Sequence, residues 1–314
     1  MKKIIVILIA VFLVTFLAFL TLAAPLQKGI IPADAKWVFH FDMEKYKLTR
    51  LNDLLMKDEV LTEIEKKNTK FFKKYKINLL RDITGITIYG LGKEKKKSVL
   101  YCTGNFDQAH LLSLLEEVTT HRLIPYGKYT IHKWNRTNFG VFVAEHLVLF
   151  ARDEEAIKDA LDVIGGKKKD ITSSPLISYV EKAPSGAFII AFADNVSSII
   201  KKHAKSVILK KTRQALFTIT EQEENIIIKL NFVLESPEDA EKIGQIITGL
   251  IAMVNLQKEE MESGRRLPMD INLKTDDNNI EITLTYLSKD LVDIIAGKKR
   301  LPPFFSLGGF FSSY

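Results

Sequence analysis

Residues 226–232 read IIIKLNF, and residues 280–286 read IEITLTY. In both stretches apolar side chains occupy every second position, from Ile226 to Phe232 and from Ile280 to Leu284. Because successive side chains of a strand point to opposite faces of a sheet, this period predicts antiparallel strands with one face under helices and one face in water. We therefore expect the α+β fold class.

Further strands and helices surround these two stretches. Apolar runs predict strands at 37–41, 86–89, 99–103, 129–134, 141–144, 147–151, 187–192, 216–220, 226–234, 271–274 and 280–286. Helices are predicted at 42–75, 108–118, 153–164 and 196–213, and another opens at Ser236-Pro237. Four of these helices begin at an aspartate whose carboxylate can accept from a free backbone N–H: Asp42, Asp107, Asp153 and Asp194.

One segment occurs twice along the chain. Residues 161–169 read LDVIGGKKK and residues 292–300 read VDIIAGKKR, a displacement of 131 positions. The same displacement pairs Thr87-Ile88 with Thr218-Ile219, and it pairs apolar helix positions 109, 112 and 115 with 240, 243 and 246. A constant displacement over separated elements predicts a duplication. We expect two similar modules, each an antiparallel sheet with helices packed on one face, at 25–166 and 186–300, with a linker at 167–185 and an aromatic tail at 301–314.

The chain begins Met1-Lys2-Lys3 and then carries no charged residue up to Ala24. Lysines before an apolar run are typical of a signal peptide, and the small residues at 21–24 predict cleavage after Ala23. The alternative is a retained membrane anchor, because about 20 apolar residues can span a bilayer. In either case residues 1–24 predict export to the periplasm or cell envelope.

Two further stretches carry a resemblance to known sequences. Residues 32–42 read PADAKWVFHFD after the signal, and residues 151–156, ARDEEA, lead into a helix. With these features the chain resembles a set of uncharacterised exported bacterial proteins with a duplicated α+β module. The resemblance implies no activity for any residue.

Composition narrows the possible partners. The single cysteine, Cys102, excludes an intramolecular disulfide, so the 46% of hydrophobic residues must supply the core. The net charge of +7 is consistent with an ordinary solvated surface, and nucleic acid or anionic lipid is the alternative explanation. Export, together with a preference for Lys over Arg, argues against nucleic acid.

The chemistry-bearing residues form no catalytic or metal-binding motif. The six histidines include no pair at i, i+4, although His40 and His132 lie in predicted strands and could share a sheet face. Ser198 and Lys201 match the Ser-x-x-Lys of penicillin-recognising enzymes, but the companion Lys-Thr-Gly is absent. We therefore predict no catalytic residue, no cofactor and no metal.

Two surfaces stand out as contact sites. Lysines Lys66, Lys70 and Lys73 crowd one predicted helix. A basic helix of this kind either lies on an anionic membrane or packs on the core as an ordinary helix with its lysines in solvent. The tail carries four phenylalanines among Gly, Ser and Pro, which either pack on the sheets or contact a partner: Phe304, Phe305, Phe310 and Phe311. The expected partners are another envelope protein or an anionic membrane surface.

The sequence as a whole favours a non-enzymatic envelope protein. It would bind a ligand or a protein partner through its sheet faces or through the cleft between the modules. The alternative is a hydrolase of unrecognised type that acts on cell-envelope material. A pocket with convergent titratable groups would distinguish the two.

Overall fold

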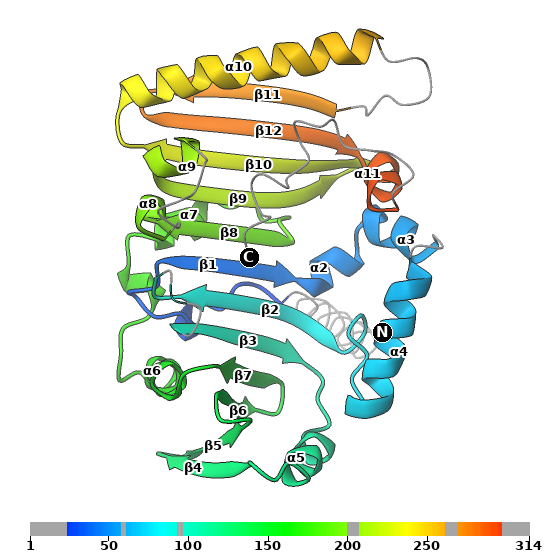
Figure 1. Cartoon of the computed structure of the whole chain (residues 1–314), viewed down its shortest axis with the longest axis vertical. Coiled ribbons are helices and arrows are strands. Elements are labelled where there is room, and N and C mark those ends of the chain that lie inside the picture. The colour runs from blue at the N-terminus through cyan, green and yellow to red at the C-terminus, as the bar shows by residue number, and fades with distance from the viewer. Residues whose placement is uncertain are drawn as a thin grey trace, which may run out of the picture.

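The computed structural model describes residues 24–57, 61–92, 94, 97–199, 207–260 and 269–296. The predicted export segment and the four tail phenylalanines lie outside these residues, apart from Ala24. The described residues form a 12-stranded sheet in the order β11-β12-β10-β9-β8-β1-β2-β3-β7-β6-β5-β4, with every neighbouring pair antiparallel. Figure 1 shows the strands stacked in one layer from α10 at one end to the β4–β5 hairpin at the other.

The strands are β1 (Trp37–Asp42), β2 (Ile83–Gly90), β3 (Ser98–Gly104), β4 (Arg122–Tyr126), β5 (Tyr129–Trp134), β6 (Asn138–Ala144), β7 (Leu147–Ala151), β8 (Ile189–Asp194), β9 (Thr212–Gln222), β10 (Asn225–Leu234), β11 (Met269–Asp276) and β12 (Asn279–Leu287). The α-helices are α2 (Met43–Lys47), α3 (Arg50–Lys57), α4 (Leu61–Tyr75), α5 (Gln108–Glu116), α6 (Glu154–Ile164), α7 (Ile177–Lys182), α8 (Val196–Ile199), α9 (Val207–Lys211), α10 (Pro237–Glu260) and α11 (Ser288–Ile295). Short 3-10 helices are η1 (Lys28–Ile30) and η3 (Ile171–Ser173). The predicted α+β class with antiparallel sheet is confirmed.

The two halves of the chain meet at a ladder of backbone pairing. Strand β1 pairs with β8 antiparallel, with Val38 opposite Phe192 and His40 opposite Ile190. Within the described residues, the two halves therefore share one continuous sheet. The predicted cleft between separate modules was wrong at this boundary. Residues 167–185, the predicted linker, pack against this sheet, since Ile171 is fully buried and its N–H donates to the Ile31 carbonyl at 2.7 Å.

Five strands have the same order on both sides of that boundary. Moving outward, one half reads β1-β2-β3-β7-β6 and the other reads β8-β9-β10-β12-β11, and the first half continues with β5 and β4. A helix follows the third strand of each half, α5 or α10, and another follows the strand that pairs with that third strand, α6 or α11. This order is what a duplication requires, and the duplication itself stays a prediction.

Local sequence signals located most elements correctly. Strands β10 and β12 pair over their whole length, with Ile228 opposite Leu284. The carboxylates of Asp42, Asp107 and Asp153 each accept a hydrogen bond from the backbone N–H three residues later, which confirms them as caps.

Two long predicted helices were wrong. The helix predicted at 42–75 is divided into α2, α3 and α4, because Thr49 Oγ1 accepts from the Asn52 N–H and starts a new helix there. The helix predicted at 196–213 gives way to β9 at Thr212, whose hydroxyl donates to the Ile208 carbonyl at 2.7 Å. Asp194 lies in β8 and accepts from Gln214 Nε2 at 2.9 Å.

Strand β4 was missed because Pro125 lies within it. Proline donates no backbone hydrogen bond and is therefore tolerated mainly at sheet edges. Strand β4 is the terminal strand of the sheet, beyond β5.

In the first half, helices cover both faces of the sheet, so the prediction of helices on one face was wrong. On one face Tyr101 and Leu149 pack with Ile157 and Leu161 of α6. The opposite face carries a cross-strand row that packs with side chains of α4 and α5: Phe41, Ile86, Cys102 and Val148. Both faces are apolar here, and this second face carries the candidate site.

Candidate functional site

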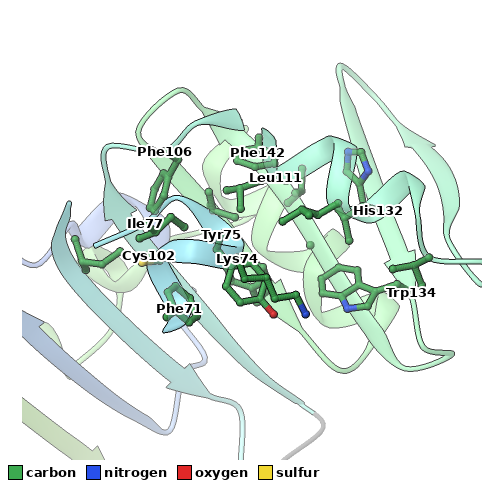
Figure 2. Close-up of a pocket in the computed structure, with 18 of the residues that line it drawn as sticks. Phe71, Lys74, Tyr75, Ile77, Cys102, Phe106, Leu111, His132, Trp134 and Phe142 are labelled. Carbon is green, nitrogen blue, oxygen red and sulfur yellow. The ribbon is translucent and has the colours of Figure 1, made fainter. Parts of the chain in front are cut away.

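A pocket of about 430 Å³ lies between helices α4 and α5 and the sheet. We call it the α4–α5 pocket. Figure 2 shows aromatic and aliphatic side chains around it on several sides. The lining comprises Phe71, Lys74, Tyr75, Ile77, Leu79, Ile83, Cys102, Phe106, Leu111, Leu114, Leu115, Val118, His132, Trp134, Asn135, Gly140, Val141, Phe142, Val148 and Phe150.

Helix α5 forms one wall of the pocket. Its sequence, QAHLLSLLE, is rich in leucine, yet none of its residues is fully buried. Three of those leucines, Leu111, Leu114 and Leu115, border the hollow. An apolar helix that buries no residue completely is what results when its apolar face borders open space rather than a packed core.

Helix α4 forms a second wall of the pocket, and hydrogen bonds fix its position. The Asn68 side chain accepts from the Leu79 N–H at 2.9 Å and donates to Asn78 Oδ1 at 3.1 Å. The Lys74 carbonyl lies 2.9 Å from His110 Nε2, which joins α4 to α5. The ring of Tyr75 packs on Phe71 with centroids 4.5 Å apart. The wall is therefore held by polar contacts outside the pocket and is apolar inside it.

The sheet supplies the floor and one end. Trp134 stands edge-on to Phe150, with ring centroids 6.4 Å apart. It lies over Gly140, where an added Cβ would come within 3.1 Å of the indole ring. The glycine thus gives the indole room to border the pocket.

Few polar groups reach the pocket, and none of its lining residues is acidic. Burial raises the pKa of the Cys102 thiol to about 11, so it stays protonated at neutral pH. His132 Nδ1 lies 3.1 Å from Nε2 of His121, and the two rings stack. Burial, and then repulsion from His121, lower the pKa of His132, which favours its neutral form.

The three predicted contact lysines lie on the same helix as some of the lining residues but not in the lining. Lys66, Lys70 and Lys73 are exposed on α4, and none of them belongs to the lining. The tail residues lie outside the part of the chain that the structure describes. Lys74, the immediate neighbour of Lys73, is the lysine that reaches the lining.

His40 and His132 do not meet. His40 lies in β1 and His132 in β5, with β2, β3, β7 and β6 between them. His40 is 3% exposed, its Nδ1 lies 2.9 Å from Thr87 Oγ1, and burial lowers its pKa to about 4. Among the described residues, no three His, Cys, Asp or Glu side chains are grouped so as to hold a metal ion.

Sequence reasoning missed the pocket itself, although two signals pointed toward it. The aromatic residues Phe71 and Tyr75 lie among the lysines of α4, and the leucines of α5 follow each other with no charge between them. Both patterns are also typical of ordinary core helices. The sequence shows which faces are apolar but gives no measure of the space between them.

Comparison with known proteins identifies the fold only. No family model matches the chain, and no curated protein matches it. Crystal form III of TP0453, a Treponema envelope protein, is similar in structure with a TM-score of 0.52 and 11% sequence identity, over 86% of this chain and 97% of that one. Crystal form I gives a TM-score of 0.48 at 12% identity, over 87% of this chain and 98% of the other. The chain has a TP0453-like α+β fold. No helix within the described ranges has the length and apolar character needed to cross a membrane.

Proposed function

We propose that the protein is an exported, non-enzymatic binding protein of the cell envelope that holds an apolar ligand in the α4–α5 pocket. The observation that carries this proposal is the pocket itself, about 430 Å³ in volume and lined almost entirely by apolar side chains. Ligand sites in proteins are commonly concave, apolar and roughly 300–1,000 Å³ in volume. Each CH₂ group transferred from water would contribute about 0.8 kcal/mol, so a ten-carbon chain gains roughly 8 kcal/mol before the cost of its lost freedom.

The pocket can be tested by filling it. Replacing Leu111 by Trp places a larger side chain into the space that the ligand would occupy. A neutral fluorescent dye, N-phenyl-1-naphthylamine, should bind the wild-type protein with increased emission and should bind Leu111→Trp at least about tenfold more weakly. The matched control is Ile246→Trp on α10, where the native side chain is 55% exposed. Equal dye binding by Leu111→Trp and the control would overturn the proposal.

Export is supported by the environment of Ala24. Its backbone nitrogen lies 3.4 Å from Oδ1 of Asp42, a carboxylate that is fully buried. Cleavage after Ala23 would make that nitrogen an α-ammonium group, a second cation beside a buried carboxylate whose Oδ2 lies 3.4 Å from Lys45 Nζ, and added positive charge stabilises a buried carboxylate. The likeness to an envelope protein also agrees with this location.

The mass of the mature protein tests this step. Purified from the envelope, the chain should begin at Ala24, and Asp42→Asn should destabilise that mature form more than it destabilises a chain that keeps Ala23. A mass that includes residues 1–23 would support the retained anchor instead.

The exposed lysines of α4 support a second proposal, contact with an anionic membrane surface. Lys66, Lys70 and Lys73 are spaced at i, i+4 and i+7, so they share one face of the helix. That arrangement places three positive charges beside the pocket, and each lysine near an anionic surface contributes about 1 kcal/mol.

Vesicle co-sedimentation tests the lysine face. Wild-type protein should sediment with phosphatidylglycerol vesicles but not with phosphatidylcholine vesicles, and changing the three lysines to Glu should abolish the difference. The control changes three exposed lysines of the other half to Glu: Lys210, Lys274 and Lys289. Equal loss in the two triple variants would indicate net charge alone and would contradict a role for α4. Another envelope protein stays the alternative partner for this face and for the aromatic tail.

A further inference from the structure

The α4–α5 pocket is lined by two side chains that can only donate hydrogen bonds and by no acidic side chain. The side chains that bring nitrogen to the lining are Lys74, His132, Trp134 and Asn135, and no Asp or Glu accompanies them. The ammonium group of Lys74 is a donor only, as is the indole N–H of Trp134. The polar part of the lining therefore includes two obligate donors and one positive charge, beside Tyr75, His132 and Asn135, which can also accept.

Neither of the two obligate donors is used within the described part of the protein. Lys74 makes no ion pair with a described residue, and its Nζ lies over the Tyr75 ring, 5.0 Å from the centroid. Trp134 contacts Phe150 through its ring, and its N–H donates to no described residue. The other tryptophan, Trp37, does have a partner, since its N–H donates to the Gly92 carbonyl at 3.1 Å.

The two obligate donors lie toward the same edge of the pocket. In Figure 2 the Lys74 nitrogen, the Tyr75 oxygen and the Trp134 nitrogen lie toward one edge of the lining, beside Phe71, whereas the His132 ring lies toward the other edge with Leu111. Lys74 is also exposed, so this edge is open to solvent. The pocket thus has an apolar interior and a donor-rich rim.

We infer that the ligand is an anionic amphiphile, with its hydrocarbon chain inside the α4–α5 pocket and its negatively charged head group at Lys74 and Trp134. This inference rests on the proposed function and specifies its ligand. A cationic head group would be repelled by Lys74 and would find no acidic partner in the lining. A neutral head group could accept a hydrogen bond from Lys74, but it carries no charge opposite to the ammonium group and would gain no Coulomb attraction.

Two sources share this chemistry, a carboxylate and a phosphate monoester. Dodecanoate and dodecyl phosphate represent them, and dodecanol is the neutral comparison of equal chain length. Each is used below its micelle-forming concentration to displace N-phenyl-1-naphthylamine from the full mature chain. We expect one or both anions to displace the dye at concentrations on the order of tenfold lower than dodecanol. The stronger of the two anions identifies the head group.

Lys74→Met provides the decisive variant, because it keeps an unbranched side chain and removes the charge. It should abolish the preference for the anion, because it should weaken dodecanoate binding far more than dodecanol binding. Lys73→Met is the matched control, an exposed neighbour on the same helix that does not line the pocket, and it should keep the preference.

Equal binding of anion and alcohol by the wild type, or an anion preference that survives in Lys74→Met, would overturn the inference while leaving the pocket intact. If none of the three compounds displaces the dye, the proposed function fails as well.

The fluorescence of Trp134 can report which end of the bound hydrocarbon chain lies near the rim. The protein contains two tryptophans, so Trp37→Phe leaves Trp134 as the only reporter. Bromine quenches indole fluorescence at short range. A head group at the rim predicts that 2-bromododecanoate quenches Trp134 more strongly than 12-bromododecanoate. Stronger quenching by the 12-bromo compound would place the chain end at Trp134 and would contradict the inference.

Discussion

A larger side chain at Leu111 should be tolerated by the fold, because Leu111 is only partly packed and borders the open space of the α4–α5 pocket. Leu111 is only partly buried and borders the α4–α5 pocket of about 430 Å³, which has room for an indole ring. We expect Leu111→Trp to change the free energy of unfolding by less than about 1 kcal/mol. The same enlargement at a fully packed position provides the comparison. The comparison is Leu149→Trp, since Leu149 is fully buried on the opposite face of β7.

In a close-packed region, extra volume displaces neighbours and costs about 1–3 kcal/mol. For a protein of this size that cost corresponds to a fall in melting temperature of roughly 2–4 °C per kcal/mol. Urea denaturation followed by circular dichroism would measure both variants. A loss in Leu111→Trp as large as the loss in Leu149→Trp would refute the reasoning, because it would show that α5 and the sheet leave no open space in solution.

Three further predictions concern the remainder of the fold. On α10, Ile247→Ala should lower the free energy of unfolding by about 2–5 kcal/mol, because Ile247 is 7% exposed and packs on the sheet. Ile246 is 55% exposed, so Ile246→Ala should change that free energy by no more than about 0.5 kcal/mol. Equal losses in urea denaturation would contradict this orientation of the helix. Removing the Asp153 cap with Asp153→Ala should cost about 1 kcal/mol by loss of the bond from the Ala156 N–H, and no change in melting temperature would contradict it. Burial lowers the pKa of His40 in the folded protein to about 4, from its usual value of 6.5, so folding favours the neutral imidazole. The free energy of unfolding is therefore highest above pH 6.5 and should fall by roughly 3 kcal/mol as the pH decreases from 6.5 toward 4. The slope of stability against pH in that window should flatten in His40→Gln, and an unchanged slope would assign it to other groups.

The strands and caps were predictable because their signals are local. The period-2 pattern at Ile226–Phe232 specifies a strand whatever its partner, and Asp107 caps α5 through the N–H of His110 only three residues away. The union of the halves was not predictable in this way. Pairing of β1 with β8 joins residues 38 and 192, and periodicity carries no information about which strand lies next to which.

The candidate site was predictable only in part, for a geometric reason. Lys73 and Lys74 are adjacent in a lysine-rich helix, and nothing in the sequence separates them. Successive residues of a helix point about 100° apart, so the rotation of α4 on the sheet decides which lysine reaches the pocket. That rotation depends on contacts between distant elements, such as the hydrogen bond between Asn68 and the Leu79 N–H.

Native mass spectrometry with added dodecanoate tests the central claim most directly. The mature wild-type chain should carry one dodecanoate per molecule, and Leu111→Trp should carry none under the same conditions. The Ile246→Trp control should bind as the wild type does. The absence of a complex with the wild type, or equal occupancy in Leu111→Trp, would contradict an apolar ligand site between α4, α5 and the sheet.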